Sequence, residues 1–386
     1  MISDRMMKRN LLTLTLALSG FAQGHAAAKP NLLIIHTDEH NFRTLGCHRN
    51  HLDGDQAYVW GEDVKVDTPH IDSLAKDGAI CPRFYAASPV CTPSRASLVS
   101  GLYPQATGAP SNNMPLHDNI VTFAEVLRRD GYATSYLGKW HLDGSAKPGW
   151  APKRQFGFAD NRYMFNRGHW KILEDGPDGP RVGARDKKGN PSYGIDGVTE
   201  KNFTTDFLTD RALEILQRDK DQPFCMMISI PDPHGPNTVR APYDTLYKDL
   251  TFKKPRTMVQ TLADPDSRPK WDWKGPKGAV KNLNQEGLQK YFGMVKCLDD
   301  NIGKLLKFLD DEGLTENTIV VFSSDHGDMM CEHCRYNKGV PYETSAGVPF
   351  VVRYPAKIKP GKVVNTVHTT VDFAPTILGL MGVSEN

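Results

Sequence analysis

The chain has 386 residues, of which 39% are hydrophobic and 24% charged, a composition typical of soluble globular proteins. The formal net charge is only +2, so the charge balance does not indicate a nucleic-acid partner. At about 150 residues per domain, the length allows roughly two or three domains. The 33 glycines and 27 prolines indicate many turns and long functional loops.

The first 28 residues have the pattern of an export signal. Basic residues Arg5, Lys8 and Arg9 precede an apolar run at 11–21, and small residues follow at 22–28. The apolar run is too short for a convincing membrane span, and no later stretch is apolar enough to form one. We therefore expect residues 29–386 to form the mature, exported domain, periplasmic or secreted. An uncleaved anchor is the alternative.

Apolar runs at 31–36, 132–137, 224–230, 318–322 and 349–353 predict strands, and the first and fourth are typical of buried parallel strands. Amphipathic spacing predicts helices at 67–76, 121–129, 203–216 and 288–309. Alternating strands and helices predict an α/β fold with a mostly parallel central sheet. Residues 148–202 and 250–282 lack periodicity and are expected to be long loops. In the first loop, the aromatic and basic residues 161–170 could line a sugar site or simply pack on the surface.

Asp38 and Glu39 directly follow the first predicted strand. Ligands in open α/β sheets bind at the carboxyl ends of the strands. Adjacent carboxylates supply the hard oxygen ligands that Ca²⁺ and Mg²⁺ prefer. A solvated acidic loop is the alternative reading of this pair.

Residues 88–101 form a turn followed by a predicted helix, in which Pro93 suits the first turn and Gly101 can end the helix. Cys91 would lie just before the helix N-terminus, where free N–H groups favour an anion, and Arg95 could point back to the same place. This arrangement suggests chemistry on a sulfate or phosphate. The alternative is a buried cysteine before a helix.

The sequence Cys-Thr-Pro-Ser-Arg at 91–95 resembles the core motif of the type I, formylglycine-dependent sulfatase family. Four further motifs follow in the family's order. They are Gly-Lys-Trp-His at 138–141, Pro-His at 233–234, Ser-Asp-His-Gly at 324–327 and Asn-Lys-Gly at 337–339. The resemblance implies an alkaline phosphatase-like α/β/α sandwich. The family's usual C-terminal antiparallel subdomain has no counterpart before Asn386, and we expect it to be missing.

The resemblance also implies a site and a mechanism. A maturation enzyme would oxidise Cys91 to formylglycine, whose hydrate attacks sulfur and later expels sulfate. Asp38, Glu39, Asp325 and His326 would hold a divalent cation, Ca²⁺ or alternatively Mg²⁺. Glu39 replaces the usual second aspartate of the family. The other implied catalytic residues bind sulfate, stabilise the nucleophile or move protons: Arg95, Lys139, His141, His234 and Lys338.

The function implied is an exported sulfatase acting on a sulfated sugar or glycan. One alternative is a phosphate or phosphonate ester hydrolase of the same superfamily. The other is a catalytically silent, truncated glycan-binding protein.

The chain contains seven cysteines, so at least one thiol has no intramolecular partner, and Cys91 would lose its thiol on oxidation. Cys331-Glu332-His333-Cys334 looks like a metal or redox motif, but no second cysteine pair has zinc-site spacing. We expect either a local disulfide or two free thiols there.

Overall fold

The computed structural model describes residues 29–272 and 279–383, and the predicted export signal at 1–28 lies outside the described residues. An eight-stranded sheet in the order β11-β2-β10-β9-β1-β8-β4-β5 organises the fold. Its strands are β1 (Asn31–Asp38), β2 (Ala79–Ile80), β4 (Ala133–Lys139), β5 (Met164–Phe165), β8 (Phe224–Pro233), β9 (Thr318–Ser324), β10 (Phe350–Arg353) and β11 (Lys362–Val363). Two small sheets pair β3 (Phe84–Tyr85) with β12 (His368–Thr369), and β6 (Leu173–Gly176) with β7 (Gly179–Val182).

The centre of the large sheet is parallel. Strand β1 lies between β8 and β9 and runs parallel to both, with Leu33 opposite Met226 on one side and Val320 on the other. Strand β4 continues the parallel arrangement beyond β8, whereas β10 is antiparallel to β9. The predicted mostly parallel α/β sheet is therefore confirmed.

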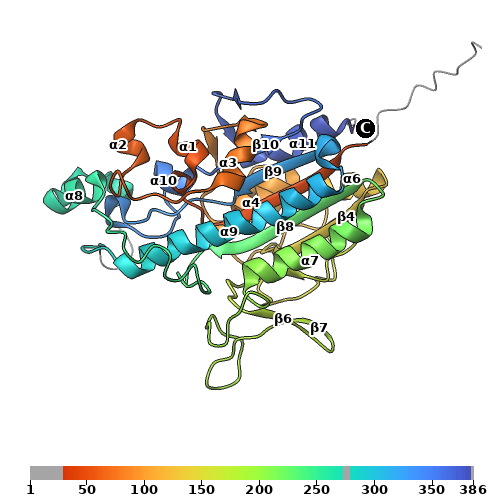
Figure 1. Cartoon of the computed structure of the whole chain (residues 1–386), viewed down its shortest axis with the longest axis horizontal. Helices are drawn as coiled ribbons and strands as arrows, with labels where there is room; N and C mark the ends of the chain where they lie inside the picture. The colour runs from red at the N-terminus through yellow and green to blue at the C-terminus, as the bar shows by residue number, and fades with distance from the viewer. Residues whose placement is uncertain (1–28, 273–278, 384–386) are drawn as a thin grey trace, which may run out of the picture.

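Helices cover both faces of this sheet. Helices α7 (Thr204–Asp219) and α9 (Gln285–Asp311) lie on one face, and α4 (Cys91–Ser100), α6 (Phe123–Arg129) and α11 (Phe373–Met381) lie on the other (Figure 1). The remaining α-helices are α1 (Gly46–Arg49), α2 (Gly54–Ala57), α3 (Pro69–Lys76), α5 (Pro104–Thr107), α8 (Arg256–Ala263) and α10 (Glu343–Ala346). Short 3₁₀ turns are η1 (Phe42–Thr44), η2 (Pro265–Ser267), η3 (Lys270–Asp272), η4 (Thr315–Asn317), η5 (Glu332–Cys334) and η6 (Thr370–Asp372).

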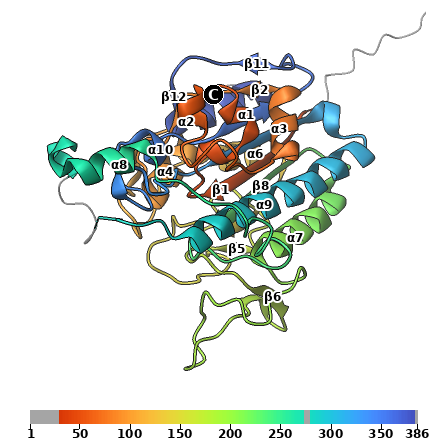
Figure 2. The same cartoon turned by 60° about the vertical axis from the view of Figure 1, so that its left-hand side comes forward.

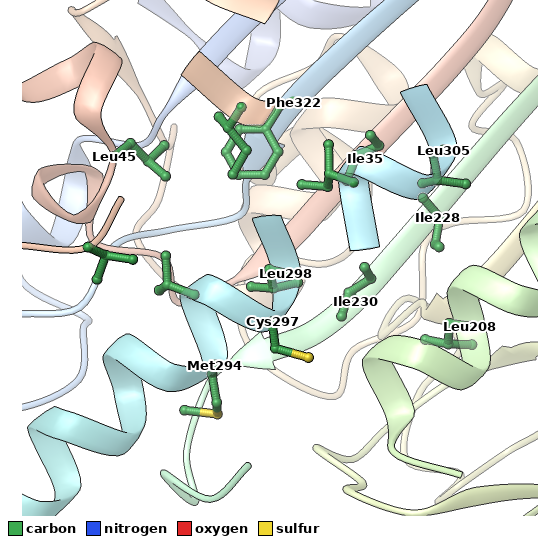
Figure 3. Close-up of a cluster of buried hydrophobic side chains, with 14 of the residues drawn as sticks. Ile35, Leu45, Leu208, Ile228, Ile230, Met294, Cys297, Leu298, Leu305 and Phe322 are labelled. Atoms are coloured by element: carbon green, nitrogen blue, oxygen red, sulfur yellow. The ribbon is translucent and has the colours of Figure 1, made fainter. Parts of the chain in front are cut away.

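The core has two halves because successive residues of a strand point to opposite faces. On β1, Leu33 and Ile35 join the cluster that contains α7 and α9, while Leu32 and Ile34 join the cluster that contains α4, α6 and α11. Figure 3 shows the first half, where the α9 leucines lie close to Ile35 and to the β8 isoleucines. Each fully buried leucine or isoleucine contributes about 1.5–3 kcal/mol.

Both expected loops contain regular structure. Residues 250–282 include α8 and two 3₁₀ turns, so the expectation of a loop there is wrong for these segments. In α8 only Met258 and Thr261 are buried, while the apolar side chains of Val259 and Leu262 are exposed. Residues 148–202 include β5 and the β6–β7 hairpin, which extends away from the sheet in Figures 1 and 2.

All seven cysteines are buried and unbridged. Cys331 and Cys334 therefore follow the two-free-thiol alternative, and in the described residues neither belongs to a cluster of potential metal ligands. Of the helices in the described ranges, none is both long and apolar enough to cross a bilayer.

Candidate active site

The motif residues meet at the carboxyl ends of the central strands. Asp38 ends β1, Lys139 ends β4, Asp325 follows β9 and His234 follows β8. At this edge of an α/β sheet, loops that are far apart in the sequence lie close together in space. Just before Lys139, Gly138 has φ +94°, and a Cβ atom there would lie 1.9 Å from the Ser229 carbonyl oxygen. Only glycine allows β4 to approach β8 this closely.

Helix α4 begins at Cys91, whereas the sequence predicted that Cys91 lies just before the helix. Cys91 is 2% exposed. Its Sγ lies 3.2 Å from His326 Nε2, 3.6 Å from Lys139 Nζ and 3.8 Å from Asp38 Oδ1. Burial, with Asp38 adding to it, raises the pKa of the Cys91 thiol. The unmodified thiol is therefore a weak nucleophile at neutral pH.

Arg95 lies beside the two aspartates and makes no hydrogen bond to Cys91 within the described ranges. Its Nη2 donates to Asp38 Oδ2 and its Nε to Asp325 Oδ2, both at 2.9 Å. Its Nη1 donates to the Lys139 carbonyl and to Ser229 Oγ, both at 2.8 Å. Arg95 thus orients both carboxylates and leaves their Oδ1 atoms on the side of His326.

Asp38, Asp325, His326 and Cys91 can each offer one ligand atom within 4.8 Å of the others, and all four are buried. His326 Nδ1 lies 3.0 Å from the Gly327 carbonyl, while Nε2 faces Cys91 Sγ and the Oδ1 atoms of the two aspartates. Burial would raise the pKa of Asp38, but Lys139 and Arg95 outweigh it and hold that pKa well below its usual range. Two ionised carboxylates beside an imidazole nitrogen fit a divalent cation.

Glu39 is turned away from this cluster. Its Oε2 lies 2.8 Å from His234 Nε2 and accepts from Lys338 Nζ at 3.0 Å. Its buried Oε1 has no hydrogen-bond partner in the described part of the chain. Burial would raise the pKa of Glu39, but His234 and Lys338 lower it to about 2. Glu39 is thus an ionised group with one oxygen still available, next to the aspartate cluster.

Two lysine–histidine pairs lie beside the aspartates, and Lys139 Nζ also donates to Asp38 Oδ2 at 2.5 Å. Lys139 Nζ lies 2.7 Å from His169 Nε2, and Lys338 Nζ lies 2.6 Å from His234 Nε2. The rings of His169 and His234 are stacked, with centroids 3.4 Å apart. His169 was not among the predicted site residues, although it belongs to the aromatic and basic segment 161–170 noted in the sequence.

His141 lies at the edge of the cluster, with a φ of 64° that is uncommon for a non-glycine residue. Its carbonyl accepts from Thr92 Oγ1 at 2.9 Å, and its Nε2 lies 3.0 Å from Asn113 Oδ1. Its Nδ1 is buried and has no hydrogen-bond partner in the described chain. Burial, with Lys139 and Arg95 nearby, lowers the pKa of His141 to about 2, so the ring is neutral.

A second group of residues that the sequence analysis did not identify, Lys171, Asp232 and Thr205, holds the backbone at His234 in place. The buried Lys171 Nζ donates to Asp232 Oδ1 at 2.5 Å and to the His234 carbonyl at 3.2 Å. Thr205 Oγ1 donates to the other Asp232 oxygen at 2.6 Å. These bonds fasten the end of β8 to the segment that carries His169. A lone lysine in a loop gives no sequence signal for such a role.

Comparisons with known proteins place the chain in a family. The model of the Sulfatase family matches residues 30–383. The chain is 35% identical to the ulvan-active sulfatase of Formosa agariphila over 92% of its own length and 62% of that protein. It is 27% identical to the N-acetylglucosamine-6-O-sulfatase of Bacteroides thetaiotaomicron, covering 98% of this chain and 73% of that protein.

A solved structure from Bacteroides fragilis, described as a sulfatase, superimposes with a TM-score of 0.71 at 28% identity, covering 92% of this chain and 74% of the other. The chain thus spans about three fifths of the length of the ulvan-active sulfatase and about three quarters of this structure. The family match and the shared fold lead to one conclusion. The chain belongs to the sulfatase family of the alkaline phosphatase-like superfamily.

Proposed function

We propose that this chain is an exported sulfatase that hydrolyses sulfate esters on a sulfated sugar or glycan. One observation carries the proposal: the buried Cys91 Sγ lies 3.6 Å from the Lys139 ammonium, 3.8 Å from Asp38 and 3.2 Å from His326, and Lys139 itself donates to Asp38 Oδ2 at 2.5 Å. The ammonium can hold an anionic ester, and the carboxylates and the imidazole can hold a divalent cation. Family membership and the names of the relatives support this reading.

The nucleophile requires modification of Cys91. The raised pKa of the Cys91 thiol argues against a thiolate as the attacking group. We infer that a maturation enzyme converts Cys91 to formylglycine and that Asp38, Asp325 and His326 hold Ca²⁺ or Mg²⁺, with Glu39 Oε1 available beside them. Hydrated formylglycine would supply an oxygen nucleophile, and the cation would supply positive charge next to the sulfate.

The chain's own side chains bind and orient the ester. Lys139 Nζ and Lys338 Nζ are the donors for sulfate oxygens, because both ammonium groups lie at the cluster. Burial would lower the pKa of Lys338, but Glu39 holds it above its usual range, so Lys338 stays charged. Arg95 acts through the carboxylates, which it fixes by two hydrogen bonds at 2.9 Å. It is a positioning residue.

Two histidines can contact the exchanging protons. The buried Nδ1 of His141 has no partner in the described chain, so it can accept a hydrogen bond from a hydroxyl of the nucleophile, whereas its pKa of about 2 makes it a weak base. His234 Nε2 contacts both Lys338 Nζ and Glu39 Oε2, and it can donate a hydrogen bond or a proton to the oxygen of the departing alcohol. Stacking against His169 fixes the plane of the His234 ring.

Mass spectrometry of the tryptic peptide from Phe84 to Arg95, in protein from the natural host, tests the nucleophile. We expect this peptide to be lighter than the cysteine form by about the mass of a water molecule. Turnover of 4-nitrophenyl sulfate, phosphate and phosphonate then tests the ester class, and sulfate should be the best substrate. Preference for phosphate or phosphonate would identify the superfamily alternative instead. An unmodified peptide with no turnover of any ester would favour the silent, glycan-binding alternative.

A further inference from the structure

A second pocket lies outside the catalytic cluster, between α8, η2 and the segment that runs from η5 to α10. It has a volume of about 510 Å³. Its polar lining includes Thr257, Gln260, Asp264 and Arg268, and its aromatic lining consists of His333 and Tyr342. Figures 1 and 2 both draw α8 beside α10 at one end of the molecule. None of the residues assigned above to the catalytic site lines this pocket.

Three aromatic rings form a group here: His333 and Tyr342 line the pocket, and Trp271, outside the lining, contacts Tyr342. The His333 ring stacks on Tyr342 with centroids 3.8 Å apart and planes inclined by 7°. The Trp271 ring lies 4.9 Å from Tyr342, inclined by 54°. Trp271 is 50% exposed, although an indole of this size is usually largely buried. A flat apolar ring with polar groups at its edge matches a sugar ring, which has an apolar C–H face and hydroxyls at its rim.

Buried polar contacts hold this group of rings, here called the aromatic platform (Trp271, His333 and Tyr342), in place. Tyr342 Oη donates to Asp272 Oδ2 at 2.9 Å, and the buried Asp272 also pairs with Arg335. The backbone N–H of His333 donates to Thr257 Oγ1 at 3.2 Å, which joins the platform to α8. A site that is already ordered loses little entropy when a ligand binds.

The pocket lining carries one cationic side chain, Arg268, and one carboxylate, Asp264, and the cation can bind an anionic ligand. Arg268 is partly buried in the lining, and among the described residues its side chain makes only a hydrogen bond to the Pro265 carbonyl and no ion pair. A guanidinium without a carboxylate partner can bind a sulfate in a bidentate manner.

The platform also lies close to the catalytic cluster. Tyr342 is four positions after Lys338 in the chain, so their Cα atoms are at most about 14 Å apart. Next to Lys338, the Gly339 N–H donates to the Pro89 carbonyl, in the turn that leads to Cys91. One oligosaccharide chain could therefore reach both places.

We propose that Trp271, Tyr342 and Arg268 form a subsite for a second, sulfated sugar ring of a glycan whose first ring occupies the catalytic cluster. This subsite rests on the proposed function for the identity of the first ring. It makes the protein selective for extended sulfated oligosaccharides over small sulfate esters.

Binding can test the subsite without turnover. Isothermal titration calorimetry would use the full chain with Cys91→Ser and two probes, an ulvan disaccharide and an ulvan octasaccharide. We expect Trp271→Ala and Arg268→Ala each to weaken octasaccharide binding by about tenfold and to leave disaccharide binding unchanged. Trp271→Phe should recover most of the loss, because it keeps an aromatic face. Val259→Ala is the matched control, since Val259 is a 51% exposed residue of α8 outside the pocket lining.

The opposite outcomes are distinct. Equal losses of affinity for both probes would overturn the subsite, and so would octasaccharide binding that neither substitution weakens. Failure of the Cys91→Ser chain, with Trp271 and Arg268 intact, to bind either probe would also overturn it. Failure of the proposed function is read separately, from 4-nitrophenyl sulfate turnover by the matured wild-type protein. A chain that hydrolyses no sulfate ester but binds the octasaccharide through Trp271 would retain the subsite.

Discussion

The imidazole rings of His169 and His234 are stacked with their centroids 3.4 Å apart and their planes inclined by 7°. Each ring also contacts a lysine, His169 with Lys139 and His234 with Lys338. Burial, with Lys139 and His234 nearby, holds the pKa of His169 well below its usual range. His169 is therefore neutral, and its Nε2 can accept a hydrogen bond from the Lys139 ammonium. The stack therefore positions both cationic donors at once.

We predict that His169→Ala lowers kcat for 4-nitrophenyl sulfate by about 100-fold, because Lys139 loses a hydrogen-bond partner and His234 loses the ring on which it stacks. The fold should persist, since His169 belongs to a loop. The measurement is steady-state kinetics together with circular dichroism. His117→Ala is the control, because His117 is exposed and its side chain forms no hydrogen bond in the described residues. A wild-type kcat in His169→Ala would show that the stack has no catalytic role.

Gly138 offers a test of how the sheet positions Lys139. With φ at +94° and the Ser229 carbonyl 1.9 Å from a built Cβ, Gly138→Ala must separate β4 from β8. We expect a loss of more than about 3 kcal/mol in the free energy of unfolding, measured by urea denaturation. Gly144 has φ +70° and no atom within 4 Å of its Cβ position, so Gly144→Ala should cost only about 1–2 kcal/mol. Similar losses for the two variants would contradict the close approach.

The sequence predicted much of this arrangement, for physical reasons that differ between elements. Strand β1 is buried on both faces and reads as one apolar run, and α9 buries a long stripe, so both were correctly predicted. Helix α8 was missed although its eight residues carry an amphipathic pattern, because the surrounding segment is polar and rich in proline. His169 could not be assigned a role because its contacts come from residues far away in the chain, and no local pattern records them.

Glu39 illustrates a limit of motif transfer. The motif predicts a metal ligand at this position, and the side chain is one methylene longer than the usual aspartate. Its Oε2 lies against His234 and Lys338, and only Oε1 remains without a partner in the described chain. Spacing along the sequence cannot distinguish a ligand from a residue that holds the cationic side chains.

Asp299 predicts a pH dependence of stability away from the active site. Its Oδ1 accepts from the backbone N–H groups of His70 and Ile71 at the start of α3. Burial raises the pKa of Asp299 to about 6. Between about pH 4 and 6 the folded state therefore binds more protons than the unfolded state, so stability falls as the pH rises through this window and stays lower above it.

We expect Asp299→Asn to keep the helix cap through its amide oxygen and to remove this pH dependence. The free energy of unfolding of the variant minus that of wild type should be roughly 2 kcal/mol more favourable at pH 7.5 than at pH 4. Urea denaturation at both pH values gives the two free energies of unfolding. Asp310→Asn is the control, an exposed position of the same helix α9. An unchanged pH slope in Asp299→Asn would refute the assignment.

The last prediction concerns the divalent cation. Asp38 and Asp325 are both fully buried, and burial and the charge of Asp38 oppose the ionisation of Asp325, although the nearby cationic groups hold its pKa below the usual range. A bound cation relieves this repulsion, so Ca²⁺ should stabilise the folded chain. At a concentration of about 100 times Kd, the gain should be about 2.7 kcal/mol, visible as a rise in Tm that EDTA reverses. Asp325→Asn should lose this rise, because one ligand loses its charge.

Asp118→Asn, at a fully exposed position, should keep the rise in Tm and thereby separates ligation from a general effect of ionic strength. Replacing Ca²⁺ with Mg²⁺ in the same titration compares the two cations, and a smaller rise with Mg²⁺ would favour Ca²⁺ because Mg²⁺ gives up its water shell less readily. If Asp325→Asn gained as much from Ca²⁺ as wild type does, the cation would bind elsewhere. The pairing of Arg95 with Asp38 and Asp325 would then be the element that balances their charge, and the site would rely on that guanidinium and on Lys139 alone.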